Sequence, residues 1–101
     1  MNSSKIIGNF DYKTIHTKQV NNIKEYFEPF LIDEKFDDII EIGTALGGLT
    51  LILHDIIKDN SLNAKIWTFD IVDIAFNGIK DIDIIYFEKL DSAFPVFLLR
   101  R

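Results

Sequence analysis

One stretch of the sequence, residues 38–51, has the pattern of a buried strand that runs through a glycine-containing turn directly into a helix. The strand contains Glu41, and the turn contains Gly43, Gly47 and Gly48. Glycine lets the backbone turn sharply and approach a ligand closely, and the first N–H groups of a helix have no partner within the helix. The stretch therefore predicts a site for a nucleotide-type ligand where the strand meets the helix.

The residues after this turn alternate between helix and strand patterns. Apolar residues recur at i, i+3, i+4, i+7 and i+8 across 49–57, which predicts an amphipathic helix. Strand patterns follow at 65–71, with an end at Asp70 or Ile71, and at 82–87, joined by a short helix or irregular crossover at 73–80. This order predicts an α/β fold with a three-stranded parallel sheet, flanking helices and ligands beyond the carboxyl ends of the strands.

The apolar spacing before the glycine turn predicts one more helix. Its apolar stripe consists of Val20, Ile23, Phe27 and Phe30. Thr14 or Thr17 is the expected N-cap, and Pro29 predicts a kink or an end near Glu28. The β-branched run at 38–42 is typical of a parallel strand that is covered on both faces.

Length and composition limit the classes of function. With 101 residues, 48% of them hydrophobic, the chain is expected to form a lead-in at 1–13 and one domain at 14–101. A net charge of −5 and no basic block argue against nucleic acid as a partner. The absence of cysteine excludes disulfides and thiolate metal sites. No apolar run approaches the roughly 20 residues of a membrane span, so a cytoplasmic protein without a membrane partner is expected.

The glycine turn resembles the first motif of the class I S-adenosylmethionine-dependent methyltransferases, an acidic residue, x, Gly, x, Gly or Ala, x, Gly. The matching residues are Glu41, Gly43, Ala45 and Gly47. Residues 48–51 are similar to the helix start of the O-methyltransferase-like and cephalosporin-hydroxylase-like branches. The resemblance covers roughly residues 14–92 and implies the N-terminal half of that domain, a partial Rossmann-like sheet of three strands.

The resemblance implies S-adenosylmethionine as the cofactor and places its methionine end at the turn. Glu41 would lie near the methionine end of the cofactor. The backbone that approaches the cofactor closely would come from Gly43, Thr44, Ala45 and Gly47. The protein would then chiefly align the cofactor methyl with a nucleophilic oxygen or nitrogen.

The adenosine end of the cofactor is implied at the next two strands. Asp70 would accept hydrogen bonds from both ribose hydroxyls, because a carboxylate offers two acceptor oxygens. Ile71 would pack on the adenine face. Asp91, or Ser92 beside it, resembles the position that meets the adenine amino group, although Leu90 stands where the family has a glycine.

A dinucleotide site is the alternative interpretation of the same turn. Gly43, Ala45 and Gly48 form a degenerate version of that fingerprint, and Asp70 lies about 20 residues further on. The carboxylate of Glu41 would repel a pyrophosphate, whereas it would attract the ammonium and sulfonium groups of S-adenosylmethionine. Glu41 therefore favours S-adenosylmethionine over NAD.

The family's sheet has seven strands, with the fourth beside the first, and this chain stops before a fourth strand. Residues 91–99 are similar to the start of a further helix. The chain is thus expected to be a cofactor-binding half that does not catalyse methyl transfer on its own. A noncatalytic interaction module, which assembles through its open sheet edge with a second copy or a complementing chain, is the other hypothesis.

The remaining polar and aromatic residues have simpler interpretations. His16 and His54 are expected to be solvated, and no metal site is predicted. The acids at 33–34 and 37–38 are interpreted as solvated loop charges. Trp67 and the phenylalanines are expected to fill the core rather than stack on bases.

Overall fold

The computed structural model describes residues 10–17, 19 and 21–90 of the chain. Its elements are, in order, β1 (Phe10–Tyr12), β2 (Ile15–Thr17), α1 (Ile23–Glu34), β3 (Asp38–Ile42), α2 (Gly48–Asp59), β4 (Lys65–Asp70), the 3₁₀ helix η2 (Ile79–Asp81) and β5 (Ile85–Lys89). β1 and β2 form an antiparallel hairpin, and β3, β4 and β5 form a parallel sheet in that order. The predicted α/β fold with a three-stranded parallel sheet is confirmed.

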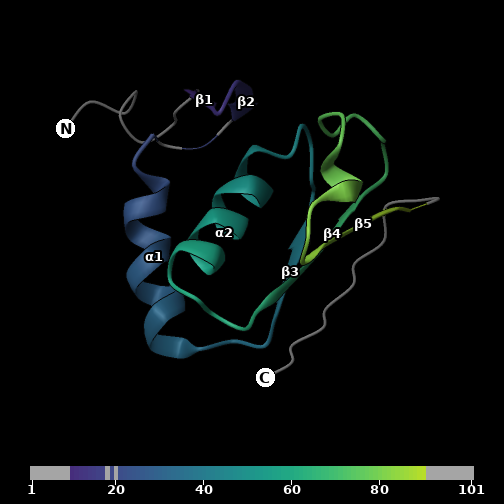
Figure 1. Ribbon diagram of the computed structural model, residues 1–101. Helices are drawn as coiled ribbons and strands as arrows, with labels where there is room; N and C mark the ends of the chain where they lie inside the picture. Colours follow the sequence, from purple (N-terminus) through teal and green to yellow (C-terminus); the bar gives the residue numbers. More distant parts are fainter. Residues whose placement is uncertain (1–9, 18, 20, 91–101) are drawn as a thin grey trace.

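The elements form layers, with α2 between the sheet and α1 (Figure 1). The hairpin lies at the same end of the molecule as the turn that leads from β3 into α2 (Figure 1). Because the three strands are parallel, their carboxyl ends lie at one end of the sheet, where α2 begins beside the hairpin.

The core is built mainly from α2 and the central strand β4. The helix pattern predicted for 49–57 buries Ile52, Leu53, Ile56 and Ile57. These side chains pack in one cluster with Ile66 of β4 and Ile85 of β5. Complete burial of an isoleucine side chain contributes about 1.5–3 kcal/mol. The apolar face of α2 therefore fixes the helix on the sheet, and with it the turn that precedes the helix.

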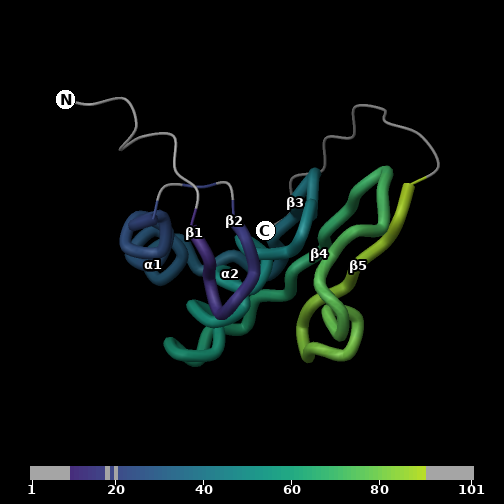
Figure 2. The backbone as a smooth tube through the Cα atoms, turned by 90° about the horizontal axis from the view of Figure 1, so that it is seen from above, coloured from purple at the N-terminus to yellow at the C-terminus, as the bar shows by residue number. Residues whose placement is uncertain are grey.

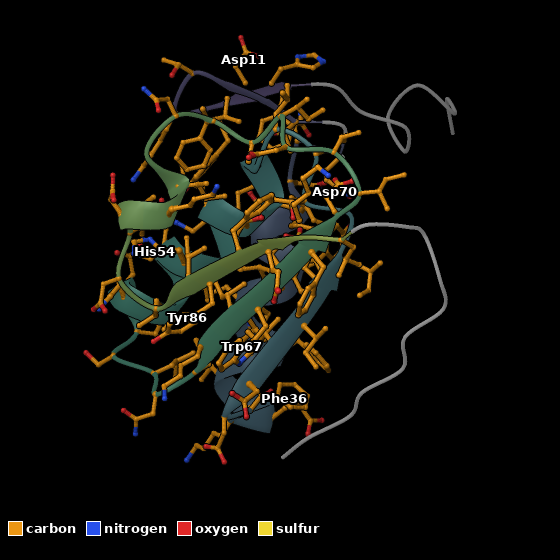
Figure 3. The ribbon with its side chains drawn as sticks, turned by 90° about the vertical axis from the view of Figure 1, so that its right-hand side faces the viewer. Asp11, Phe36, His54, Trp67, Asp70 and Tyr86 are labelled. Carbon is orange, nitrogen blue, oxygen red and sulfur yellow. The ribbon has the colours of Figure 1, made fainter. Side chains whose placement is uncertain are left out.

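The other face of the sheet carries exposed apolar side chains over the described residues (Figure 3). We call it the open face, and by the strand register it comprises Ile40, Ile42, Trp67, Phe69 and Tyr86. The rings of Trp67 and Tyr86 stack with centroids 4.6 Å apart. The expectation that 38–42 is covered on both faces is therefore wrong within the described part of the chain, because Ile42 is 57% exposed and the side chains of this face project away from α2.

Trp67 also departs from its predicted place in the core, since its side chain lies on the open face and is 36% exposed. Its indole N–H donates to the Asp38 carboxylate at 2.8 Å. Asp38 is thus a strand residue with a hydrogen-bond donor rather than a solvated loop charge. Burial in β4 follows the two-residue alternation of a half-covered strand, which places Ile66 inside and Trp67 outside.

The N-terminal helix does not begin at the predicted caps. Lys13 and Thr14 have positive φ angles of 48° and 73° and form the turn of the hairpin. Thr17 pairs with Phe10 across the hairpin. The predicted N-caps therefore belong to an element that the sequence pattern did not predict, which also takes up part of the lead-in at 1–13.

Helix α1 continues through Pro29 instead of ending near Glu28. Pro29 and Glu25, the residue whose carbonyl loses its N–H partner, are both exposed, and a missing helix hydrogen bond costs less at the surface than in the core. Leu31 is the buried residue of the helix, whereas Phe30 is 48% exposed, contrary to the predicted stripe. Val20, the first residue of that stripe, lies outside the described residues.

The third strand of the sheet begins three residues later than predicted, at Ile85. Ile84 has a φ angle of 67°, a conformation that ends extended pairing on its N-terminal side. The preceding connection is irregular until η2, which follows Gly78 at a φ angle of 94°. Residues 91–99, predicted as the start of a helix, lie outside the described residues. Among the described residues, no helix has the length and apolar character to cross a bilayer.

Candidate functional site

The turn between β3 and α2 has the backbone that its glycines predicted. Gly43 and Gly47 have φ angles of 96° and 97°, and Ala45 between them has a φ of 50°. The N–H groups of Gly43 and Thr44 donate to the Phe69 carbonyl of β4 at 2.7 and 3.2 Å. The turn is thereby fastened to the neighbouring strand. A Cβ atom at Gly43 would meet no atom within 4 Å, so the space above this glycine is open.

Glu41 is held by hydroxyl groups from two other elements. Its Oε1 atom accepts hydrogen bonds from Thr50 of α2 and, at 2.6 Å, from Thr68 of β4. The Thr68 oxygen also lies 2.6 Å from the Thr44 hydroxyl. Since Thr68 gives its only proton to Glu41, Thr44 must be the donor in that bond. This chain of hydroxyls joins the turn, both strands and the helix around one carboxylate.

Asp70 fastens the same turn from the end of β4. Its Oδ2 atom accepts the Ala45 N–H at 2.7 Å, and its Oδ1 atom accepts the Val72 N–H at 3.3 Å. The N–H of Ile71 also contributes to holding this carboxylate. A carboxylate has about four lone-pair sites, so one remains for a further donor. Asp70 is therefore a structural part of the turn that can still accept a hydrogen bond from a ligand.

The pKa values of Glu41 and Asp70 are shifted in opposite directions. Burial raises the pKa of Glu41 above its usual value, and the nearby charge of Asp70 raises it further, although the bonds from Thr50 and Thr68 oppose this. The N–H of Ala45 lowers the pKa of Asp70, and this outweighs the effect of its slight burial. The charge of Asp70 is thus stabilised by the turn, whereas the charge of Glu41 is held at a cost to the fold.

A cavity of about 290 Å³ lies over the turn. It is lined by Glu41, residues 43–49, Ile74 and three residues near the hairpin, His16, Thr17 and Gln19. The Oε2 atom of Glu41 has no hydrogen bond to a described residue, and Glu41 is one of the residues that line the cavity. The volume is close to the lower end of the range for small-molecule sites, roughly 300–1,000 Å³.

The structure brings most of the predicted site residues together. Glu41 and the backbone of the turn line the cavity, although the Thr44 side chain is turned inward to Thr68. Asp70 and Ile71 lie outside the lining, and Asp70 is joined to it through the Ala45 N–H. Asp91 lies outside the described residues.

Three contributions to the site were not predicted. Thr50 and Thr68 hold Glu41, and the hairpin supplies one wall of the cavity. Thr68 could have been noticed in the sequence, because it is a threonine inside the apolar strand at 65–70 and a buried hydroxyl needs a hydrogen-bond partner. The hairpin has no comparable signal, since its strands are only three residues long.

The two histidines do not form a metal site with the residues around them, and no group of three potential ligands occurs among the described residues. His16 is half exposed and lies 3.3 Å from the Asp11 carboxylate. His54 is less solvated than predicted, because its side chain is 17% exposed and its Nδ1 atom lies 2.8 Å from Asp55.

The sequence matches no protein-family model and no curated protein. Two solved structures of a protein titled cmcI nevertheless have the same fold. One, titled as the Mg-SAM form, gives a TM-score of 0.73 at 14% identity over 81% of this chain and 36% of the other. The second, titled as the SAH form, gives 0.72 at 14% identity over 81% of this chain and 43% of the other. The chain therefore spans less than half the length of these proteins and has the Rossmann-like fold of the class I methyltransferases.

Proposed function

We propose that this chain binds S-adenosylmethionine over the glycine turn, as the cofactor-binding half of a methyltransferase-type domain. The observation that carries the proposal is the cavity at Gly43, whose lining includes Glu41, an acid with one carboxylate oxygen that no described residue bonds. The two structural neighbours titled as SAM and SAH forms support the choice of ligand.

The chemistry of the residues fits the separate parts of this cofactor. The ammonium group of the methionine portion would bind at Glu41, where burial strengthens the attraction between opposite charges. A ribose hydroxyl would donate to the remaining lone-pair site of Asp70. Ile71 and Val72, which are 46% and 43% exposed at the end of β4, would provide an apolar surface for adenine.

The bound cofactor supplies an electrophilic methyl group, and this chain's own contribution would be binding and alignment. The methyl acceptor, an oxygen or nitrogen nucleophile, would be held by groups other than those described here. NAD fits less well, because its pyrophosphate would lie near the carboxylate of Glu41.

A matched pair of glycine variants tests the proposal. Gly43 and Gly78 have nearly the same φ angle, 96° and 94°, and a Cβ atom meets nothing within 4 Å at either position. Gly43→Ala and Gly78→Ala should therefore lose similar stability, roughly 1–2 kcal/mol. Only Gly43→Ala should weaken S-adenosylhomocysteine binding, by roughly tenfold or more, because only its methyl group enters the cavity.

Calorimetric titration of the wild-type chain with S-adenosylhomocysteine and with NAD is the measurement, with chemical unfolding of each variant beside it. Saturable binding of the first ligand, lost in Gly43→Ala and kept in Gly78→Ala, supports the proposal. Absence of binding to a folded wild-type sample would refute it, and preferential binding of NAD would favour the dinucleotide interpretation.

The open face supports a second candidate function, a module that assembles with another chain. Ile42 is 57% exposed on β3, which is an edge strand of the sheet among the described residues. Exposed apolar strands at a sheet edge promote pairing. Under this hypothesis the chain should elute as a dimer in size-exclusion chromatography, and Ile42→Lys should convert it to a monomer. A wild-type monomer at all concentrations would contradict assembly through this edge.

A further inference from the structure

The carboxylate of Asp55 on α2 is the meeting point of three polar side chains. Its Oδ2 atom accepts the Tyr12 hydroxyl proton at 2.5 Å and lies 2.8 Å from the Lys13 ammonium nitrogen. Its Oδ1 atom lies 2.8 Å from His54 Nδ1. The Asp55 side chain is 10% exposed. A carboxylate this well buried would be costly without partners, and two of its three partners come from the hairpin.

The titration behaviour of this cluster agrees with the geometry. Burial raises the pKa of Asp55, but the bonds from Lys13, Tyr12 and His54 and the positive charge of Lys13 together lower it by more, so that it lies below its usual value. Burial and the neighbouring Asp55 carboxylate raise the pKa of Tyr12. The phenol therefore stays protonated and keeps donating to Asp55.

The hairpin is docked at a second point, where Thr17 rests on Gly48 at the start of α2. A Cβ atom at Gly48 would lie only 1.8 Å from the Thr17 hydroxyl oxygen, so glycine is needed for this approach. The hairpin crosses over α2 in the view from above (Figure 2). A two-stranded hairpin is at best marginally stable in water by itself. Its position therefore depends on these contacts with α2.

The docked hairpin forms part of the cavity. His16, Thr17 and the nearby Gln19 line the same space as Glu41 and the glycine turn. A ligand that fills the cavity would contact these residues. Asp55 itself is not in the lining, so it would affect such a ligand only through the hairpin.

We propose that Asp55 is a positioning residue for the cofactor site: it holds the β1–β2 hairpin in place as a wall of the cavity. This inference rests on the proposed function, because it assumes that the ligand occupies the cavity. Docking of the hairpin and binding of the ligand are then linked, so each stabilises the other by the same free energy.

Amide hydrogen exchange measures hairpin docking directly. Asp55→Asn should lower the protection of amides in residues 10–17 on the order of tenfold, since hydrogen bonds to a charged group are lost. Amides in β4 should keep their protection. Tyr12→Phe, which removes one hydroxyl and leaves the packing, should act in the same direction by less. Asp83→Asn is the control, because it breaks a Lys58 ion pair of the same 2.8 Å length away from the hairpin.

The ligand provides the second arm of the test. With S-adenosylhomocysteine at about 100 times its Kd, hairpin protection in the wild type should rise by up to about 100-fold, the limit for an undocked state that does not bind the ligand. If bound ligand does not change amide exchange in the hairpin, or if exchange is the same in Asp55→Asn and Asp83→Asn, this inference is wrong while the proposed function stands. Absence of ligand binding to the folded wild type would instead overturn the proposed function, and this inference with it.

Discussion

Replacing Glu41 by glutamine is expected to weaken S-adenosylhomocysteine binding roughly 30-fold or more, while the fold stays at least as stable at neutral pH. The loss of affinity follows because removing one member of a buried charge pair costs about 2–5 kcal/mol of binding, and 1.4 kcal/mol corresponds to about tenfold. The gain in stability follows because glutamine keeps an acceptor oxygen for Thr50 and Thr68 without burying a charge.

The pH dependence of stability gives an independent check on this variant. The pKa of Glu41 is raised above 4.5 in the folded protein, so the folded state binds this proton more tightly than the unfolded state. Its contribution to stability should therefore increase as the pH falls from the raised pKa toward 4.5. In Glu41→Gln this contribution should be absent over the same range.

Urea unfolding between pH 4 and pH 8 and calorimetric titration at neutral pH measure both effects. Glu88→Gln, which removes the same charge from an exposed position on β5, controls for the change in net charge. A Glu41→Gln protein that binds S-adenosylhomocysteine as tightly as the wild type would show that this carboxylate does not contact the ligand.

Gly47→Ala should destabilise the fold by about 3 kcal/mol. At a φ angle of 97° an alanine is strained, and its Cβ atom would lie 2.7 Å from the Phe76 ring. Strain costs roughly 1–2 kcal/mol and overpacking roughly 1–3 kcal/mol. Gly43→Ala has the same strain without the overlap and should lose less.

A double-mutant cycle separates the two causes. Phe76→Leu reduces the ring that faces Gly47, so the double variant should recover the overlap part of the loss, roughly 1 kcal/mol or more. Chemical unfolding of the wild type, both single variants and the double variant gives the coupling energy. Simple additivity would mean that the ring moves aside at no cost and that strain alone destabilises Gly47→Ala.

The sequence was sufficient to predict the elements whose structure is determined by residues close together in the chain. The helix at 49–57 was predicted because its apolar period is long and regular, and the turn because Gly43 and Gly47 permit positive φ angles. The strand at 65–71 was likewise predicted, and its observed end at Asp70 is one of the two ends expected. These features depend on a few adjacent residues, so the sequence pattern alone is enough to predict them.

Features that depend on distant partners were missed. Thr14 and Thr17 are equally suited to a helix cap and to a short hairpin, and docking against Asp55 and Gly48 decides in favour of the hairpin. The run of Ile39, Ile40 and Ile42 lacks the alternation that marks a half-covered strand, so the exposure of Ile42 had no signal in the sequence. Which acceptor Thr68 would meet also depended on the register between β3 and β4.

The stacked pair on the open face gives the protein a built-in optical probe. Trp67 is the single tryptophan of the chain, and it is partly exposed beside Tyr86 on the side of the sheet away from α2. Its fluorescence therefore reports on this side and not on the cavity. Emission that shifts to the blue on mixing with another polypeptide would reveal contact there, whereas a cofactor filling the cavity should leave the spectrum unchanged.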